Sequence, residues 1–270
     1  MDLSLFDYEF PKELTAQHPL PNREDSRMMV VDRTKGSWTH ENFRDFPSHL
    51  KAGDVLVLNN ALADLVEMDG KLVPALPPYI KRKKADDFTE EDFRRYRTVY
   101  GQAPGSKAAP TAGFHFSEGT LERLKAMGVE IRFVTLHVSF DTYKPIRSEN
   151  ILEHPMHGER FEVPEETFEA VNRAKAEGRR VIAVGTTSVR ALESRANTRF
   201  APTPETKLFI TPGYKFQIVD ALLTNFHRPK STVLVMVSAF AGRELVLAAY
   251  AEAIRERYRL FSYGDCMLIL

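Results

Sequence analysis

The amino-acid sequence predicts an α/β protein with a mixed sheet, and two patterns carry this prediction. Short apolar runs rich in β-branched residues, such as residues 55–58 (VLVL) and 181–184 (VIAV), are typical of strands buried on both faces. Segments bounded by helix-start and helix-stop residues, such as 164–178, alternate with these runs. The 270 residues could form one large domain or two smaller ones. Because strand signals continue on both sides of residues 61–75, we expect a single α/β domain over residues 1–270.

The expected strands are short, and all but one are continuously apolar. Residues 130–139 (EIRFVTLHVS) instead alternate apolar and polar side chains, as a half-buried strand does. Residues 61–75 contain only a tight-turn signal at 68–71 and are expected to be a short connection. The expected strands are residues 28–32, 55–58, 130–139, 181–184, 208–210 and 233–237.

The expected helices are recognised by their ends. Ser117 can cap a helix that Gly128 closes, and Pro164 followed by two glutamates suits the positive end of a helix. Pro47 weakens the first helix, although aromatic residues recur there at helical spacing. The expected helices are residues 41–50, 117–128, 164–178, 189–196 and 243–258.

Charge and cysteine content narrow the possible functions. Lys plus Arg and Asp plus Glu both total 37, so the chain has no global attraction to nucleic acid or to an anionic membrane. Any RNA binding must therefore use a local basic patch. The single cysteine, Cys266, allows no internal disulfide and no cysteine-rich zinc site. The N-terminus does not resemble a signal peptide, and no apolar run is long enough to span a bilayer. The expected location is the cytosol.

One stretch has the composition of an RNA contact. Its basic residues are interleaved with Tyr79, Tyr96 and Tyr100, so it could bind phosphates and stack on bases. The alternative is a solvated charged loop. The basic residues are Lys81, Arg82, Lys83, Lys84, Arg94, Arg95 and Arg97.

A strand–turn–helix junction at residues 181–188 is suited to an anion. Gly185 permits a tight turn, after which free N–H groups and two threonine hydroxyls stand at a helix start. A carboxylate or phosphate would fit there. The junction is not a P-loop, because GxxxxGK is absent, and a threonine-capped helix is the simpler alternative.

Histidines occur in several polar clusters. Residues 154–159 (HPMHGE) place two histidines and a glutamate together, but Pro155 breaks the helix that a zinc motif needs, so acid/base work is favoured over metal binding. The clustered histidines lie next to predicted strands or loops, although any one alone could be structural. They are His115, His137, His154, His157 and His227.

The loop at residues 224–232 (TNFHRPKST) carries several groups able to bind or react. Pro229 prevents a regular element, and the following apolar run at 233–237 predicts a buried strand. Such a loop beside a core strand suits a binding or catalytic site, whereas the alternative is a solvated surface connection.

Taken together, these motifs resemble the S-adenosylmethionine:tRNA ribosyltransferase-isomerase (QueA) family of the queuosine pathway. The resemblance is collinear over nearly the whole chain. The motifs that carry it are FDY at 6–8, AQHP at 16–19, LNN at 58–60, LPPYI at 76–80, AAPTAGFHF at 108–116, TLHV at 135–138, HPMH at 154–157, AVGTTSVR at 183–190, PGY at 212–214, TNFH at 224–227, PKST at 229–232 and FSYGD at 261–265.

The resemblance implies an enzyme with a defined reaction. The family transfers the ribosyl carbons of S-adenosylmethionine to an aminomethyl-deazaguanine at the tRNA wobble position, forming an epoxycyclopentane ring and releasing adenine and methionine. It implies tRNA and S-adenosylmethionine as partners, with the latter a substrate, and no metal or redox cofactor. A non-catalytic relative that binds tRNA or S-adenosylmethionine is the alternative, and a nucleotide hydrolase is a third possibility.

The resemblance also exposes one departure from the family pattern. After Asn59 and Asn60 the family continues with Thr and Arg and then an inserted β-barrel domain. Here Ala61 and Leu62 follow, and residues 61–75 are too few for a barrel. The small domain is therefore expected to be missing or truncated.

Site roles follow from the chemistry that the resemblance implies. A base must remove a proton next to the sulfonium, and departing adenine needs a proton or a hydrogen-bond donor. We expect His115, with His227 and Thr186, around one pocket. The catalytic candidates are His115, His157 and His227. The candidates for an anion, such as the methionine carboxylate, are Thr186, Thr187 and Ser188. The residues expected to orient substrates are Asn225, Lys230 and Asp265, and Arg190 either pairs with an anion or packs on its helix.

Overall fold

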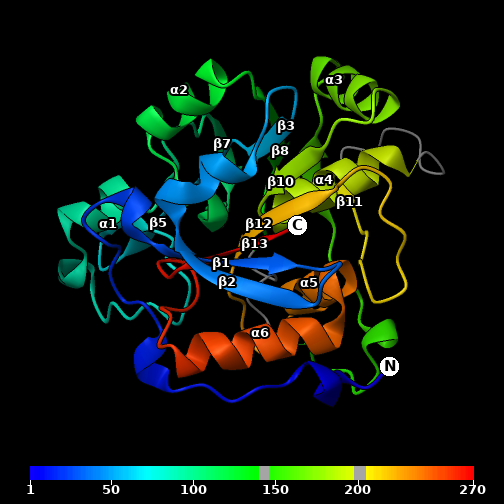
Figure 1. The fold of residues 1–270 in the computed structure, drawn as a ribbon. Helices are drawn as coiled ribbons and strands as arrows, with labels where there is room; N and C mark the ends of the chain where they lie inside the picture. The colour runs from blue at the N-terminus through cyan, green and yellow to red at the C-terminus, as the bar shows by residue number, and fades with distance from the viewer. Residues whose placement is uncertain (140–145, 198–204) are drawn as a thin grey trace.

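The computed structural model describes residues 1–139, 146–197 and 205–270, and in these residues one nine-stranded sheet organises the chain. The strands stand in the order β11-β9-β8-β3-β10-β12-β13-β1-β2 (Figure 1). Their bounds are β1 Arg27–Asp32, β2 Ser37–Asn42, β3 Val55–Asn59, β8 Glu130–Leu136, β9 Glu159–Glu162, β10 Val181–Val184, β11 Glu205–Thr206, β12 Ala221–Asn225 and β13 Cys266–Ile269.

Four neighbouring strands of this sheet, β8, β3, β10 and β12, run parallel. The flanking strands β9 and β13 run antiparallel to them, so the expected mixed α/β sheet is confirmed. From β3 the chain moves to β8 on one side, and it later returns to β10 on the other side. The carboxyl ends of the four strands meet at one edge, with a change of winding direction between β3 and β10. Open α/β sheets bind ligands at such edges.

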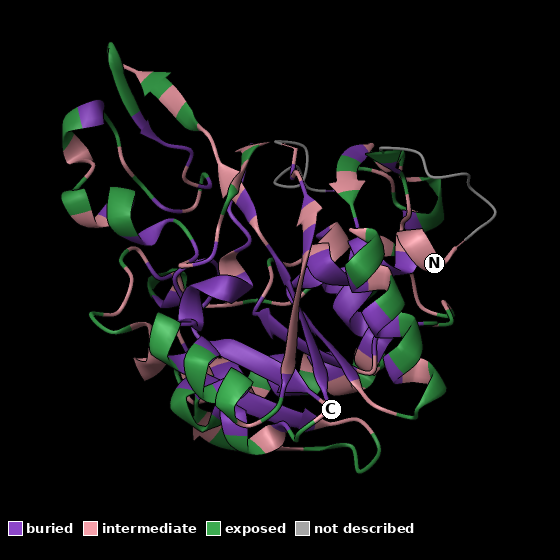
Figure 2. Cartoon of the chain, turned by 90° about the horizontal axis from the view of Figure 1, so that it is seen from above, coloured by how far each residue is buried: buried purple, intermediate pink, exposed green. Residues whose placement is uncertain are grey.

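Both faces of β3 and β10 are buried, which explains the continuous apolar sequence of these two strands. In β3, Val55 and Val57 pack into one hydrophobic cluster, whereas Leu56 and Leu58 pack into the cluster on the other face. Successive side chains of a strand point to opposite faces, so a strand covered on both sides needs an apolar residue at every position. Figure 2 shows the central strands as buried and the outer surfaces of the helices as exposed.

Helices cover the sheet on both sides. Helix α2 packs with the 3₁₀ helix η4 over one face, and α4, α5 and α6 contribute to the cluster on the other. Figure 1 shows α5 and α6 together at the bottom of the view and α2 at the top. The helices are α1 Glu90–Arg95, α2 Glu118–Ala126, α3 Glu165–Ala176, α4 Thr186–Ala196, α5 Thr232–Ala241 and α6 Arg243–Arg255; the 3₁₀ helices used below are η3 Arg23–Asp25, η4 Phe43–His49 and η6 Thr111–His115.

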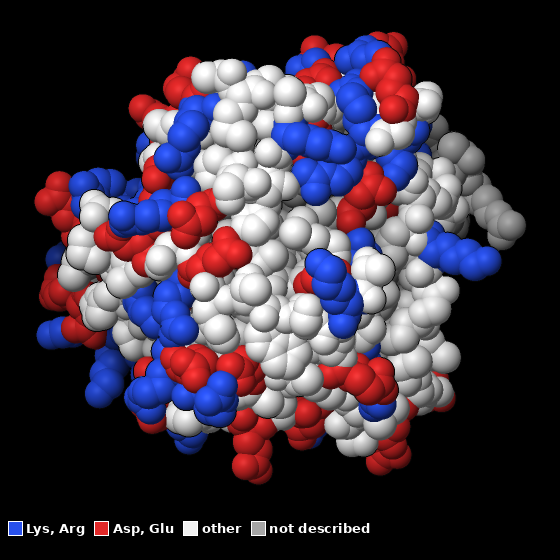
Figure 3. Space-filling view, viewed as in Figure 1, with Lys and Arg blue, Asp and Glu red and all other residues white. Residues whose placement is uncertain are grey.

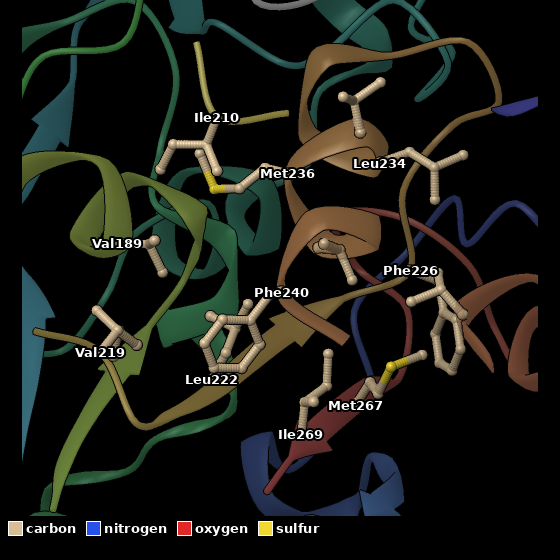
Figure 4. Packing of buried hydrophobic residues seen from close by; sticks show 14 of the residues in the cluster. Val189, Ile210, Val219, Leu222, Phe226, Leu234, Met236, Phe240, Met267 and Ile269 are labelled. Carbon is tan, nitrogen blue, oxygen red and sulfur yellow. The ribbon is translucent and has the colours of Figure 1, made fainter. Parts of the chain in front are cut away.

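The core beneath α5 holds the site-bearing strand β12 in place. Figure 4 shows Phe240 of α5 beside Leu222 of β12, with Met267 and Ile269 of β13 below them. All four side chains are buried in the same cluster. Burying large apolar side chains stabilises a fold by roughly 1.5–3 kcal/mol each. The carboxyl end of β12 is therefore anchored to rigid packing.

One prediction for the apolar stretch after the polar loop was wrong. Residues 233–237 belong to helix α5 and not to a strand. Ser231 caps this helix, since its Oγ accepts a hydrogen bond from the N–H of Leu234 (3.2 Å). A helix buried on nearly every side has the same continuous apolar sequence as a buried strand, and the strand beside this loop is β12, which precedes it.

Two further expectations need correction. Residues 41–50 are not an α-helix: β2 runs through Asn42, and η4 follows with Pro47 inside it. Phe43 and Phe46, three residues apart, suit the tighter 3₁₀ turn as well. Residues 208–210 form no strand; β11 ends at Thr206, and the carbonyl of Leu208 accepts a hydrogen bond from Arg190 Nε (3.0 Å).

The remaining elements were predicted with small errors at their ends. Ser117 caps α2, and α3 follows Pro164. The strand expected at residues 130–139 ends at Leu136, so His137 follows β8. Helix α4 begins at Thr186, three residues before the expected start. Strands β2, β9, β11, β12 and β13 and helix α1 were not predicted.

Residues 61–75, expected to be a short connection with a tight turn, contain three short strands. Strand β4, Ala61–Ala63, pairs with β7, Ala103–Ser106. Strands β5, Leu65–Met68, and β6, Lys71–Pro74, form a hairpin. Its turn lies at the expected residues 68–71, and Asp69 and Gly70 have φ of 50° and 74°, as the hairpin turn requires. Leu72, on this hairpin, is 62% exposed.

None of the described helices is by itself both long enough and apolar enough to cross a bilayer. Helices α5 and α6 would meet both requirements only in combination, and their axes are bent by 113° at the break between them.

Candidate active site

A cavity opens where β8, β10 and β12 end, and we call it the central cavity. Segments far apart in the sequence meet there, including η6, the start of α4 and the loop after β12. Its polar lining consists of hydroxyl, amide, imidazole and guanidinium groups, and aromatic rings close one side. The lining includes Tyr79, Thr111, Thr186, Thr187, Thr224, Asn225, His227, Arg228, Ser231, Phe261 and Ser262.

The start of α4 forms one wall of the central cavity. Gly185 has φ of 85°, a conformation that side-chain-bearing residues rarely adopt, and this turn directs the helix N-terminus toward the cavity. Backbone N–H groups of a first helical turn have no helical partner, and the helix dipole makes this end positive. Thr187 Oγ1 is buried and has no hydrogen-bond partner in the described residues. This wall is suited to an anion that also accepts a hydroxyl hydrogen bond.

Of the three candidates for anion binding, only two reach the central cavity. Thr186 and Thr187 line it. Ser188 is buried and turned away, and its hydroxyl donates a hydrogen bond back to the carbonyl of Val184 (2.7 Å) at the end of β10. Ser188 therefore stabilises the turn and does not face the cavity.

Asn225 is held in the central cavity by groups on both sides of its amide. Its Oδ1 accepts a hydrogen bond from Thr111 Oγ1 (3.3 Å), and its Nδ2 lies 3.2 Å from His115 Nε2. His115 Nδ1 lies 2.8 Å from Ser26 Oγ. Since the amide Nδ2 can only donate, His115 Nε2 accepts, and the proton of the neutral ring sits on Nδ1. This relay fixes the amide orientation.

His115 itself does not line the central cavity. It is 3% exposed and lies behind Asn225, beside a smaller hollow. Burial, together with nearby Arg23, Arg259 and Arg95, lowers the pKa of His115 to about 3. The ring is therefore neutral at physiological pH, and the expected grouping of Thr186, His115 and His227 around one pocket holds only for Thr186 and His227.

His227 faces the central cavity from the loop after β12. Its Nε2 lies 2.8 Å from Thr224 Oγ1, and its backbone N–H donates to Tyr250 Oη (2.9 Å). The hydroxyl of Tyr8 donates to the backbone carbonyl of His227. Burial lowers the pKa of His227 to about 4, so the imidazole is neutral and one nitrogen can accept a proton.

His157 and Arg190 lie outside the central cavity. His157 is exposed, and its backbone carbonyl accepts a hydrogen bond from Arg190 (3.1 Å). Arg190 is 4% exposed, forms an ion pair with the buried Glu159, and also donates to the carbonyl of Thr206 (2.9 Å). Burial lowers the pKa of Arg190, and Glu159 opposes that effect. Arg190 is thus occupied by the protein's own acceptors.

Lys230 and Asp265 flank the site without lining the central cavity. Lys230 has φ of 55° and forms an ion pair with Asp7 (2.6 Å). Asp265 is buried, and its carboxylate accepts hydrogen bonds from the N–H groups of Arg27 (2.9 Å) and Arg259 (2.8 Å). Burial raises the pKa of Asp265, which these N–H donors oppose. Lys230 therefore links its loop to Asp7, and Asp265 holds the backbone at Arg27 and Arg259.

The basic residues predicted to bind RNA have different surroundings. Arg82 makes a buried bidentate ion pair with Asp92 (2.9 and 2.8 Å), and the buried Arg95 donates to the carbonyls of Leu20 and Pro21. These two are structural. The exposed members are Lys81, Lys83, Lys84, Arg94 and Arg97.

Several site residues were not singled out individually from the sequence. Thr111 and Ser262 lie within the motifs at 108–116 and 261–265, but nothing in those motifs marks them as lining one cavity, and Tyr79, named with the basic stretch, lines the cavity as well. Phe261 has φ of 71°, a strained value for a non-glycine residue, and such strain is concentrated at functional sites. In residues 1–139, 146–197 and 205–270 there is no group of three or more His, Cys, Asp or Glu side chains that could hold a metal ion.

The fold and the central cavity define an α/β protein with a candidate ligand site at the carboxyl ends of its parallel strands. The chain belongs to the queuosine biosynthesis protein family, whose model matches residues 3–72 and 61–269. The resemblance noted from the sequence motifs is confirmed.

Named relatives support the same assignment. The chain is 42% identical over 344 aligned positions to a protein of Carboxydothermus hydrogenoformans, covering 100% of both chains. It is 43% identical to a protein of Acidithiobacillus ferrooxidans, covering 98% of this chain and 96% of the relative. Both are named S-adenosylmethionine:tRNA ribosyltransferase-isomerase. A crystal structure of an S-adenosylmethionine tRNA ribosyltransferase from Thermotoga maritima is similar, with a TM-score of 0.70, 33% identity and coverage of 99% of this chain and 100% of the other.

Proposed function

We propose that this chain transfers and isomerises the ribosyl moiety of S-adenosylmethionine onto the aminomethyl-deazaguanine at the tRNA wobble position. The products are epoxyqueuosine in tRNA, adenine and methionine. The observation that supports this proposal most directly is the central cavity, which combines a helix N-terminus, a neutral histidine and an oriented amide. The names of full-length relatives agree with it.

The methionine carboxylate of the substrate binds at the start of α4. Thr187 Oγ1, which has no partner in the described residues, donates to the carboxylate together with first-turn N–H groups. Tyr79 and Phe261, whose ring centroids are 5.1 Å apart, provide the aromatic side of the cavity where the adenine can stack.

His227 accepts the proton that the reaction must remove. A sulfonium acidifies the adjacent sugar carbon, and a neutral imidazole within reach can take that proton. The tautomer with the proton on Nε2, donating to Thr224, leaves Nδ1 as the basic nitrogen. The amine of the tRNA base then attacks the sugar, which the cavity holds close to it.

Asn225 orients the sugar or the departing adenine through its amide, and His115 acts as a positioning residue behind it. Arg190, Ser188, Lys230 and Asp265 support the loops around the cavity. His157 contributes its backbone carbonyl to Arg190 and takes no part in proton transfer in this proposal.

The chain forms one α/β domain that works in the cytosol, where its tRNA substrate is found. The β5–β6 hairpin stands where relatives carry the inserted barrel. Two observations support this placement: the two matched stretches of the family model overlap at residues 61–72, and the 344-position alignment with a full-length relative exceeds the 270 residues of this chain.

The test is a reaction with tRNA that carries the aminomethyl-deazaguanine. The protein and S-adenosylmethionine are added, the tRNA is digested, and its nucleosides are analysed by mass spectrometry while free adenine is quantified. We expect epoxyqueuosine and adenine in equal amounts, with no product when S-adenosylmethionine is omitted. His227→Asn should lose most of the turnover and retain S-adenosylmethionine binding. Binding of both substrates without any product identifies a non-catalytic relative instead.

A further inference from the structure

A second hollow on the surface is lined by an unusual concentration of arginine, and we call it the arginine hollow. Six arginines from η3, η4, α1, α2 and the segment after α1 line it, against three carboxylates. The arginines are Arg23, Arg44, Arg94, Arg95, Arg97 and Arg123, and the carboxylates are Glu24, Asp25 and Glu118.

The positive charge of the arginine hollow is only partly neutralised. Arg44 pairs with Asp25, Arg123 lies 3.7 Å from Glu24, and Arg95 lies 3.9 Å from Glu91. Arg94 and Arg97 are exposed and form no ion pair within the described residues. On the face shown in Figure 3, basic and acidic side chains are interleaved, as expected for a chain with no net charge.

Arg23 shows that like charges are held together in this hollow. Its guanidinium donates to the carbonyls of Phe114 (2.9 Å) and Arg97 (2.9 Å) and has no carboxylate partner in the described residues. Burial, with contributions from the neighbouring Arg95, Arg94 and Arg97, lowers the pKa of Arg23 to about 10. A site that holds several arginines close together, although their charges repel, is typical of one whose ligand supplies the negative charge.

Two buried polar atoms that line the arginine hollow also lack partners in the described part of the chain. Arg95 is 7% exposed, and its Nε has no acceptor. Thr98 is 3% exposed, and its Oγ1 has no partner. Buried polar groups are nearly always hydrogen-bonded, so these two donors leave unsatisfied polar capacity in the wall of the arginine hollow.

The arginine hollow continues toward the central cavity. A small hollow between them shares Asn22, Arg23 and Arg95 with the arginine hollow and shares Ser262 with the central cavity. A chain of phosphates lying in the arginine hollow would therefore have its neighbouring base directed toward the site where the sugar is transferred.

We infer that the arginine hollow binds consecutive backbone phosphates of the tRNA strand that carries the modified base. This inference rests on the proposed function. Arginines on several separate elements suit a polyanion better than one small anion, because each can contact a different phosphate. Residues 81–84, the basic run most evident in the sequence, do not line the hollow.

The experiment compares three double variants that each remove two exposed positive charges. Arg94→Gln/Arg97→Gln alters the arginine hollow and leaves its buried hydrogen bonds intact. Lys81→Gln/Lys83→Gln alters the basic run outside the hollow. Lys207→Gln/Lys215→Gln, on the segment after β11, is the matched control. Binding of an unmodified tRNA transcript is measured by fluorescence anisotropy from 50 to 200 mM salt (roughly the range over which phosphate contacts are resolved), and S-adenosylmethionine binding is measured by calorimetry.

We expect only the Arg94/Arg97 variant to weaken tRNA binding strongly and to flatten the log–log salt dependence. Loss of two phosphate contacts should reduce the slope by roughly 1.4–1.8, since each contact contributes about 0.7–0.9. S-adenosylmethionine affinity should be equal in all proteins. A parental slope in the Arg94/Arg97 variant, or a flattened slope only in the Lys81/Lys83 variant, overturns the inference. Displacement of the tRNA by micromolar inorganic phosphate also overturns it and identifies a small-anion site.

The same proteins separate this inference from the proposed function. If the parent forms no epoxyqueuosine but binds tRNA through Arg94 and Arg97, the proposed reaction fails and the binding surface stands. If the parent is active and the Arg94/Arg97 variant keeps the parental KM for tRNA, the reaction stands and the binding surface fails.

Discussion

At the scale of single residues, the two buried histidines at the site differ in how their ring nitrogens are hydrogen-bonded. His227 faces the central cavity, and among the described residues only its Nε2 has a hydrogen-bond partner, Thr224. His115 has both ring nitrogens engaged, one by Ser26 and one by Asn225. The free nitrogen suits proton transfer, and the doubly bonded ring suits the orientation of a neighbour. Burial keeps both rings neutral.

Neutral burial of His115 makes stability depend on pH. Its pKa is about 3 in the folded protein and about 6.5 when unfolded. The unfolded state therefore binds the extra proton as pH falls below 6.5, and stability decreases with a slope approaching about 1.4 kcal/mol per pH unit for this one group. Urea unfolding of the parent between pH 7.5 and 5 should show a steeper loss than that of His115→Gln, by about 2 kcal/mol over the range. Equal slopes for the parent and His115→Gln contradict the prediction.

Thr187 is predicted to contribute to substrate affinity rather than to turnover. Replacing it with valine keeps the shape and removes the hydroxyl that has no partner in the described residues. A hydrogen bond to a charged group is worth about 1.5–3 kcal/mol, so KM for S-adenosylmethionine should rise about tenfold or more, with a smaller change in kcat. Ser188→Ala, next along the helix but turned away from the cavity, should leave KM near the parental value. An unchanged KM in Thr187→Val places the carboxylate elsewhere.

At the scale of elements, helix α4 joins the site to the rest of the chain. Its first turn lines the central cavity, and one turn further Arg190 reaches β9 through Glu159. Near its end, the buried carboxylate of Glu193 accepts hydrogen bonds from the N–H groups of Gln217 (2.9 Å), Ile218 (3.0 Å) and Val219 (3.1 Å). These contacts hold the helix start in register with the ends of the parallel strands.

Arg190→Met tests whether this arginine supports the fold or binds the substrate. Removing it breaks the buried ion pair with Glu159, which costs about 3–5 kcal/mol in comparable buried pairs. We expect urea unfolding to show that loss, and the double variant Arg190→Met/Glu159→Leu to recover much of it. Normal stability combined with lost S-adenosylmethionine affinity would instead identify Arg190 as a substrate ligand.

At the scale of the whole molecule, the central cavity is built from segments that are spread along the chain and brought together by the sheet. Its lining comes from segments between Tyr79 and Ser262, and no short part of the chain contains it. A ligand bound there holds these segments together, so binding and folding are linked.

S-adenosylmethionine is therefore expected to stabilise the entire chain. At about 100 times its dissociation constant a ligand adds about 2.7 kcal/mol to the free energy of unfolding. Differential scanning calorimetry should show one transition that moves up by several degrees, and Thr187→Val should show a smaller shift at the same concentration. Two separate transitions, or a single transition that does not move, would contradict the prediction.

The sequence alone determined the parts of this protein that depend on local pattern. Apolar β-branched runs identified β1, β3 and β10, and the cap residues identified α2 and α3. Collinear motifs were sufficient for the family, because a motif keeps its residue types and order regardless of where its side chains point.

Only the tertiary structure decided which polar residues share a cavity. Ser188 and Thr187 are adjacent in one motif, yet the hydroxyl of Ser188 bonds back to the carbonyl of Val184, whereas Thr187 lines the cavity. The two side chains diverge because successive helical residues lie about 100° apart. Residues 233–237 form a helix, which the sequence did not reveal because burial on nearly all sides removes the periodicity that distinguishes helix from strand. Arg82 and Arg94 belong to the same basic stretch, but Arg82 forms a buried ion pair with Asp92, whereas Arg94 is exposed. Such partners are brought together by folding, and no local pattern records them.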